Sequence, residues 1–243
     1  MDHEAIILGP QLWKTIVIAS VDDFGLTVMR TSPKSYETLL VASTSYRCNH
    51  QSAYHTRVTI EMSSSYDYLF KIVVLGEGAV GKTAIVTRFS HGFFRTDYKT
   101  TIGSQFAVKN VEIPRDIGDV TVKLQIWDVA GQSRFQILRP MYYRGSSGGL
   151  LVYDVTRRRT FIVLEEWLDE LHKAINKKIP LVLVANKTDL PDRVVEPSEG
   201  HEFAQNHDMP YIESSAKTGE GIVDIFQELA EVLVAQREKG NNY

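Results

Sequence analysis

The stretch from Gly76 to Thr83 constrains this chain more than any other part of its sequence. It reads Gly-Glu-Gly-Ala-Val-Gly-Lys-Thr, with the apolar run Phe70–Leu75 before it and a helical pattern over Lys82–His91. In such a strand–loop–helix unit, glycines let the backbone curl so that successive N–H groups point at phosphate oxygens, and the helix dipole adds positive potential. The flanking strand and helix disfavour the alternative, a glycine-rich turn that binds nothing. The sequence therefore predicts a loop that binds a nucleoside triphosphate.

The residues of this loop have separate expected tasks. Lys82 is expected to reach the β- and γ-phosphates, and the Thr83 hydroxyl is expected to ligate Mg²⁺. The remaining residues expected at the nucleotide in this loop are Gly76, Gly78, Ala79, Val80, Gly81 and Ala84.

Composition limits the classes of protein to which this chain can belong. Its 243 residues, 43% of them hydrophobic, can bury a full core in one or two domains. A net charge of −3 gives no sign of nucleic-acid binding or of a polybasic membrane anchor. The single cysteine, Cys48, excludes an intramolecular disulfide and a cysteine metal cluster, and it favours a reducing compartment. With no run of membrane-spanning length and no basic signal segment, we expect a cytoplasmic monomer.

The sequence changes character near Met62, after which apolar runs alternate with helical patterns. This alternation predicts an α/β fold: a six-stranded, mostly parallel sheet with helices on both faces. Pro114 and Gly118 separate two of the apolar runs and predict a hairpin that places one antiparallel strand at an edge. The expected strands are Phe70–Leu75, Gln105–Ile113, Thr121–Asp128, Gly149–Asp154, Leu181–Asn186 and Tyr211–Ser214. The expected helices are Lys82–His91, Arg134–Tyr143, Thr160–Asn176, Glu196–Asn206 and Ile222–Glu238.

Residues 1–61 carry no motif and no repeat of the rest. Thr15–Val21 reads as a strand, and Tyr36–Ala42 as a strand or a short helix. Two interpretations stay open: a small accessory module, or a gene-model extension, disordered or never made, upstream of a natural start at Met62. The Ser-rich lead-in that follows favours the second. The predicted organisation is this N-terminal extension, a linker (62–69), a nucleotide domain (70–238) and a short tail (239–243).

The tetrapeptide Asn-Lys-Thr-Asp at positions 186–189 follows an apolar run and predicts which base is bound. The Asp189 carboxylate can accept hydrogen bonds from the ring N1–H and the exocyclic amino group of guanine. Adenine lacks this donor pair and would leave a buried carboxylate unpaired, at a cost of about 1–3 kcal/mol. Asn186 is expected to tie the base loop to the phosphate loop, and the Lys187 stem to cover one face of the base.

A second contact with the base is expected where the last predicted strand ends, in the run Ser-Ser-Ala-Lys at 214–217. The backbone N–H of Ala216 can donate to guanine O6, and Ser215 and Lys217 flank it. Alone, this run would be a helix-entry loop. Together with positions 186–189, it favours GTP over ATP.

The segment Asp128 to Gln132 ends another predicted strand and supplies reaction chemistry. Asp128 can hold Mg²⁺ through a water, the Gly131 N–H can meet the γ-phosphate, and Gln132 can orient an attacking water. Thr101 can offer its hydroxyl to Mg²⁺ and its N–H to the γ-phosphate. Phe94 can stack edge-on against guanine or make a simple hydrophobic contact with the domain.

With these motifs in order, the region from Tyr68 to Glu238 resembles a Ras-superfamily small GTPase, most closely the Rab family. The shared signatures include Ile102–Phe106, Lys123–Asp128, Tyr142–Gly145 and Leu151–Thr156. The resemblance implies a six-stranded sheet with five helices and a Mg²⁺-dependent GDP/GTP switch in vesicle trafficking. It also implies an exchange factor, a GTPase-activating protein and effectors as partners at the switch regions. The aromatic residues Phe106, Trp127 and Tyr142 either form the surface that effectors read or pack in the core.

Several positions depart from the Rab pattern. Ser133 stands where the family usually has Glu, and Val129 where it usually has Thr. The chain ends without the cysteines of a prenyl anchor, so membrane contact is expected only through a partner. Arg95 and Arg134 lie near the switch motifs, but neither is placed as a charge-stabilising finger, which predicts slow intrinsic turnover. The alternative function is a GTP-holding scaffold with little hydrolysis.

Overall fold

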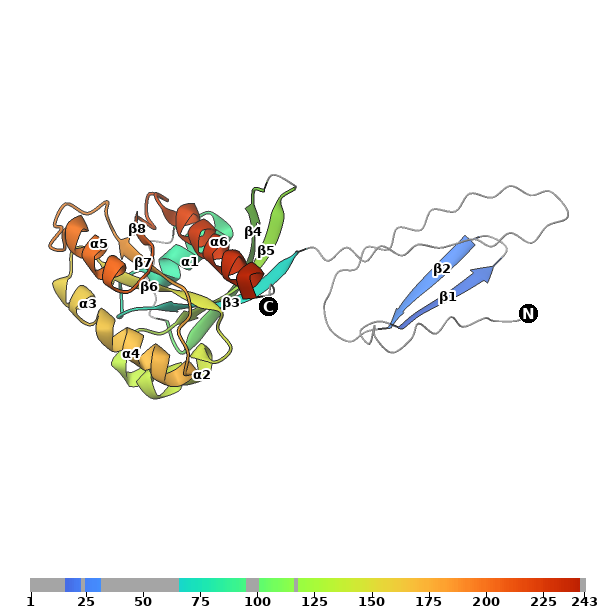
Figure 1. Cartoon of the computed structure of the whole chain (residues 1–243), viewed down its shortest axis with the longest axis horizontal. Helices are drawn as coiled ribbons and strands as arrows, with labels where there is room; N and C mark the ends of the chain where they lie inside the picture. The colour runs from blue at the N-terminus through green and yellow to red at the C-terminus, as the bar shows by residue number, and fades with distance from the viewer. Residues whose placement is uncertain (1–15, 23–24, 32–65, 95–100, 116–117, 241–243) are drawn as a thin grey trace. The chain divides into compact units, whose positions relative to one another are not determined.

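The computed structural model describes residues 16–22, 25–31, 66–94, 101–115 and 118–240. The chain divides into two units, 1–65 and 66–243 (Figure 1). In the first unit, β1 (Ile16–Asp22) pairs antiparallel with β2 (Gly25–Thr31). The strand expected over Thr15–Val21 is thus confirmed with a shift of one residue. The segment Tyr36–Ala42 lies outside the described residues.

The second unit is built on the six-stranded sheet that the sequence predicts. Its strand order is β4-β5-β3-β6-β7-β8. The antiparallel pair is β4 with β5, at the edge, and the other described pairings in this sheet are parallel. The strands are β3 (Tyr68–Leu75), β4 (Ser104–Ile113), β5 (Val120–Val129), β6 (Gly148–Asp154), β7 (Leu181–Asn186) and β8 (Tyr211–Ser214). Both the α/β class and the edge hairpin are confirmed.

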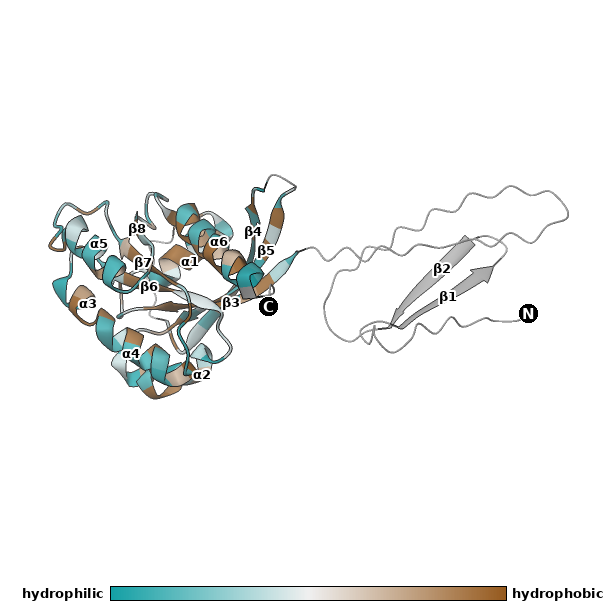
Figure 2. Ribbon diagram, in the orientation of Figure 1, coloured by the Kyte–Doolittle hydropathy of each residue, from teal (hydrophilic) through white to brown (hydrophobic). Residues whose placement is uncertain are grey.

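Helices cover both faces of this sheet, so its central strands are buried on both sides. All residues of β6 and of β7 are buried, which explains their unbroken apolar runs. Figure 2 shows brown residues in the central strands of the sheet, whereas α6 carries both brown and teal residues along its length. One core cluster joins the sheet to α1 (Lys82–His91) and α6 (Ile222–Gly240), and the other joins it to α4 (Leu164–Ile175) and α5 (Pro197–Asn206).

Two of the predicted helices are corrected by the structure. The helix expected over Arg134–Tyr143 is a 3₁₀ segment, η1 (Ser133–Leu138), followed by the short α2 (Arg139–Tyr143). No residue of η1 is buried, so packing does not hold that segment in an α-helix. The helix expected over Thr160–Asn176 is broken at Val163 into α3 (Arg158–Ile162) and α4, in a stretch rich in β-branched residues.

The topology brings the predicted motifs to one edge of the sheet. β5, β3, β6, β7 and β8 run parallel, so the loops that follow their carboxyl ends meet at the same edge. These loops carry the stretch from Gly76 to Thr83, the segment from Asp128 to Gln132, and the two base motifs. Within the described residues, no helix is both long and apolar enough to cross a membrane.

Candidate functional site

The loop that follows β3 has a backbone that only glycine tolerates at two points. Gly76 has φ +132°, and a Cβ atom there would lie 2.2 Å from the Val152 carbonyl oxygen. Gly81 has φ +101°, and its Cβ would lie 2.2 Å from Nδ2 of Asn186. These conformations curl the loop back on itself at the start of α1.

Lys82 lies inside this curled loop. Its side chain is buried, and its ammonium donates to the carbonyl oxygens of Gly76 at 2.6 Å and of Glu77 at 2.9 Å. Burial lowers the pKa of Lys82 to about 8, while the charge of Asp128 opposes this shift. With a pKa of about 8, the Lys82 side chain is mostly protonated at pH 7. Its charge lies inside the loop, where phosphate oxygens bind in a loop of this motif.

Three predicted metal ligands form one cluster beside the start of α1. The Thr83 hydroxyl lies 2.7 Å from the Thr101 hydroxyl, and it also donates a short hydrogen bond to Oδ2 of Asp128. Asp128 is buried, and Oδ1 of its carboxyl group has no hydrogen-bond partner. Burial raises the pKa of this carboxyl group, opposed by Lys82 and by the hydrogen bond from Thr83. An unsatisfied carboxylate oxygen next to two hydroxyls is an all-oxygen donor set, which fits Mg²⁺.

Gly131 and Gln132 lie directly against the phosphate loop. A Cβ at Gly131 would lie 2.5 Å from the Gly76 carbonyl oxygen and 2.5 Å from Nζ of Lys82, so a side chain cannot be accommodated there. A Cβ at Gly78 would lie 3.5 Å from Cγ of Gln132. Oε1 of Gln132 is buried and accepts no hydrogen bond. The glutamine amide thus has unused hydrogen-bonding capacity beside the phosphate loop.

At the other end of the site, Asn186 joins the base motif to the phosphate loop. Its Nδ2 donates to the Val80 carbonyl oxygen at 2.8 Å. Its Oδ1 accepts hydrogen bonds from the Ser214 hydroxyl and from the Ala216 N–H, both at 3.3 Å. Asn186 is only 1% exposed, so these hydrogen bonds are shielded from water.

The Asp189 carboxylate is positioned by the second base motif. The Ser215 hydroxyl donates to its Oδ1 at 2.7 Å, and the Lys217 ammonium lies 3.4 Å from its Oδ2. Oδ2 is buried and accepts no hydrogen bond from the described residues. It therefore has unused capacity to accept a hydrogen bond from a donor on a base. Phe94 and Ala84 are both half-buried and pack against the core cluster beneath α1 and α6.

Comparisons with known proteins agree with this geometry. The family model described as "Ras family" matches residues 71–235. The chain belongs to the Ras family. It is 46% identical over 161 residues to the Ras-related protein RABA6b of Arabidopsis thaliana, covering 66% of this chain and 69% of that relative. It is 41% identical to the GTP-binding protein YPT1 of Saccharomyces cerevisiae, covering 74% and 86%, and 42% identical to human Ras-related protein Rab-30, covering 70% and 83%.

These relatives make the chain a Rab-like small GTPase of the Ras family, whose members bind GTP and GDP and hydrolyse GTP. The aromatic residues of its Rab-type signatures have mixed environments. Phe106 is 53% exposed, and its ring centroid lies 5.2 Å from that of Trp127. Trp127 and Tyr142 are half-buried against the core cluster beneath α4 and α5. Core packing therefore accounts for part of Trp127 and Tyr142, while Phe106 faces solvent.

Asp154, Lys187 and Arg157 form a polar connection in this Ras-family member that the sequence analysis missed. Asp154 ends β6 and is buried, and its Oδ2 lies 2.7 Å from Nζ of Lys187 and 3.0 Å from Nε of Arg157. Burial opposes ionisation, but hydrogen bonds from Lys187 and Thr156 lower the pKa of Asp154. Arg157 also donates to the Gly78 carbonyl oxygen at 2.8 Å, which connects the base motif to the phosphate loop a second time. The position of Asp154 at a strand end was the signal that could have indicated it.

A second missed residue is Arg139, the first residue of α2. It is 5% exposed and donates to carbonyl oxygens of the segment that carries Gly131 and Gln132. No sequence pattern marks it, because three of its partners are backbone carbonyls and its side-chain partner Glu170 lies 31 positions along the chain. Of the two arginines near the switch motifs, Arg134 is exposed, and Arg95 lies outside the described residues.

Proposed function

We propose that this domain is a molecular switch that binds GTP or GDP with Mg²⁺ and hydrolyses GTP slowly. One observation carries the proposal: the hydroxyls of Thr83 and Thr101 and the carboxylate of Asp128 cluster at the loop that holds Lys82, and Asn186 is bonded to that same loop. The position of these residues at one edge of the sheet supports a single site for phosphate, metal and base.

In this proposal each end of the site has its own task. Lys82 and the backbone of the loop bind the phosphates, and Thr83, Thr101 and Asp128 would hold Mg²⁺, which supplies charge neutralisation at the transferring phosphoryl group. Gln132 orients the attacking water, and the Gly131 N–H donates to the γ-phosphate. Asp189 reads guanine, with Ser215, Ala216 and Lys217 around the base and Phe94 at its edge.

We further propose that an exchange factor, a GTPase-activating protein and effectors bind at the switch segments. Large apolar side chains are exposed there: Ile102 is 78% exposed, Ile137 is 89% exposed and Met141 is 68% exposed. Apolar side chains gathered on an accessible surface are typical of a binding site for other proteins. Vesicle trafficking is the process in which we expect these partners to act.

Single-turnover hydrolysis by the full chain, followed as phosphate release with and without Mg²⁺, tests the proposal. Gln132→Leu should lower the rate at least about tenfold while GDP affinity stays unchanged, because the glutamine contributes to positioning and not to binding. Asp189→Asn should shift affinity from guanine towards xanthine nucleotides. Hydrolysis that is equally fast in Gln132→Leu, or unchanged GTP affinity in Asp189→Asn, would overturn the corresponding role. Guanine-nucleotide binding without measurable hydrolysis would favour the scaffold alternative.

A further inference from the structure

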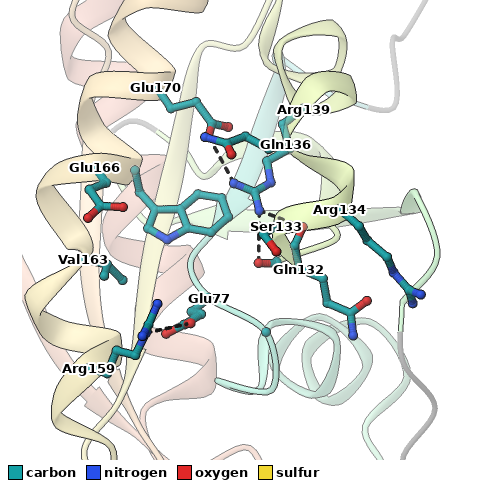
Figure 3. Close-up of a pocket in the computed structure, with 13 residues that line it drawn as sticks. Glu77, Gln132, Ser133, Arg134, Gln136, Arg139, Arg159, Val163, Glu166 and Glu170 are labelled. Atoms are coloured by element: carbon teal, nitrogen blue, oxygen red, sulfur yellow. Dashed lines mark hydrogen bonds and ion pairs between the residues drawn. The ribbon is translucent and has the colours of Figure 1, made fainter.

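The segment that carries Gly131 and Gln132 has little apolar packing to hold it. The segment η1 that follows contains no buried residue. A cavity of about 540 Å³ lies between this segment and α4, lined on one side by residues 131–134 and Gln136 and on the other by residues of α4 that include Trp167 and Glu170. Figure 3 shows Arg139 between Glu170 and the backbone at Gln132 and Ser133.

Arg139 connects this weakly packed segment to α4. Its guanidinium donates to three successive carbonyl oxygens, those of Ala130 at 3.3 Å, Gly131 at 3.1 Å and Gln132 at 2.9 Å. On its other side it donates to the Glu170 carboxylate at 3.0 Å. A planar guanidinium can make these bonds at once because its donors are arranged as a rigid fork.

The arginine is itself held in place by α4. Cζ of Arg139 lies 4.0 Å from the centroid of the Trp167 ring, a cation–π arrangement. Oε1 of Glu170 accepts the hydroxyl hydrogen of Tyr143 at 2.7 Å, so both carboxylate oxygens are engaged. Burial and the neighbouring Glu170 raise the pKa of Tyr143, which keeps this phenol protonated as a donor. Arg139 therefore has one preferred position.

This position determines where the neighbouring N–H groups point. The carbonyl of Ala130 and the N–H of Gly131 belong to one planar trans peptide unit, so they point in opposite directions. Because Arg139 holds the carbonyl on the α4 side, the Gly131 N–H is directed to the other side. That side is the phosphate loop, since Gly131 lies against Gly76 and Lys82 there. The same argument applies to the next peptide unit and orients the N–H of Gln132.

We propose that Arg139 is a positioning residue for GTP hydrolysis. It presents the Gly131 N–H to the γ-phosphate and holds the backbone of Gln132, while Glu170 and Trp167 hold the arginine. The inference rests on the roles given above to Gly131 and Gln132. It makes the α4 surface at Glu170 part of what sets the rate, although α4 carries none of the residues assigned above to the nucleotide.

The test compares full-length wild type with Arg139→Ala and Arg139→Lys, using Arg144→Ala as a matched control because Arg144 is an exposed arginine at the end of α2. Single-turnover hydrolysis should fall about 10- to 100-fold in Arg139→Ala. Arg139→Lys should be intermediate, because an ammonium cannot span three carbonyls and a carboxylate. Arg144→Ala should match wild type.

A second measurement separates positioning from general damage to the fold. Affinities for GDP and for a non-hydrolysable GTP analogue are compared, because GDP has no γ-phosphate for the Gly131 N–H to meet. Arg139→Ala should lower the affinity for the analogue about 3- to 10-fold and leave GDP within about twofold. An equal loss for both nucleotides, or a hydrolysis rate within twofold of wild type, would overturn the proposal.

The experiment stays decisive if Arg139→Ala does not fold. Glu170→Gln keeps the size and the hydrogen-bonding oxygen of the side chain but removes the charge that holds Arg139, and it should slow hydrolysis about 2- to 5-fold with GDP affinity unchanged. Wild-type rates in both Glu170→Gln and Arg139→Lys would overturn the inference. If Gln132→Leu still loses hydrolysis as expected while Glu170→Gln and Arg139→Lys keep wild-type rates, the proposed function stands and only the role of Arg139 fails.

Discussion

The base end and the phosphate end of the site are built in different ways. At the base end, Asn186 and Ser214 are buried residues that end β7 and β8, and both polar atoms of the Asn186 side-chain amide make hydrogen bonds. At the phosphate end, Thr101 and Gln132 lie in loops, and two buried acceptor atoms, Oδ1 of Asp128 and Oε1 of Gln132, have no hydrogen-bond partner. Oδ2 of Asp189 at the base end is likewise buried without a hydrogen-bond partner. The two ends therefore differ mainly in their support, since strand ends carry Asn186 and Ser214 whereas loops carry Thr101 and Gln132.

This difference indicates which part of a switch recognises the base and which part changes conformation. Strand ends inside a packed sheet move little, so they suit a constant task such as reading guanine. Loops that are held by polar contacts can be reorganised when a γ-phosphate is present or absent. The expected outcomes below test this contrast, from the largest effect to the smallest.

The largest effect is expected at the base end, from Asn186→Ala. The change removes the hydrogen bond to the Val80 carbonyl and leaves two buried donors without an acceptor, at about 1–3 kcal/mol for each unsatisfied group. GDP affinity should fall by about 100-fold or more, measured as faster release of a fluorescent GDP. Asn206→Ala, at the exposed end of α5, is the control and should release GDP like wild type. Unchanged release from Asn186→Ala would mean that the base end is not preformed by this residue.

A smaller effect is expected at the phosphate end from pH. Since burial lowers the pKa of Lys82 to about 8, this side chain is neutral above that pH until a phosphate favours its charged form. Nucleotide binding then takes up a proton, so affinity should fall by up to about tenfold per pH unit above pH 8 and stay level below it. The same shift makes the unfolded chain bind more protons than the folded chain between about pH 8 and the ordinary value of 10.5, so stability without nucleotide should rise there.

Nucleotide affinity measured from pH 7 to pH 9 checks this expectation. Lys82→Arg is the control, because arginine stays charged throughout that range and because both proteins share any titration of the nucleotide itself. Identical pH profiles for wild type and Lys82→Arg would contradict a role for the Lys82 proton.

The smallest effect is expected in the exposed part of the phosphate end. Ile137→Ser changes a side chain that is 89% exposed in a segment without buried residues, so the free energy of unfolding should change by less than about 0.5 kcal/mol. Ile126→Ala on β5, where the side chain is 0% exposed, is the comparison and should cost about 2–5 kcal/mol. Urea unfolding of both variants measures the difference. A loss above about 1 kcal/mol in Ile137→Ser would show that η1 contributes to the core after all.

Much of the fold could be predicted because its determinants are local. The apolar runs of β6 and β7 indicated buried parallel strands, and the glycine-rich stretch between β3 and α1 indicated a phosphate loop. The break at Val163 and the 3₁₀ form of η1 could not be predicted from periodicity. Both depend on what packs against the segment, and helical spacing alone does not contain that information.

The site divides in the same way. Asn186 and Asp189 could be named because a short motif at a strand end implies both the residue and its direction. Arg139 and Arg157 could not, since each donates to backbone carbonyls that lie close to it only after folding. An arginine that binds backbone oxygens needs no particular residue type as its partner, so no pair of positions in the sequence marks it.

By itself, the sequence determined the α/β class, the order of the nucleotide motifs along the chain, the nucleotide-binding chemistry and the family. These depend on residue types at fixed local spacings. Only the tertiary structure decided that Asp154 joins Lys187 to Arg157, and that Arg139 connects the backbone at Gly131 and Gln132 to Glu170. Such contacts join residues from different elements across the domain. Their strength depends on burial and on the simultaneous satisfaction of several polar atoms, and both exist only once the sheet and its helices have packed.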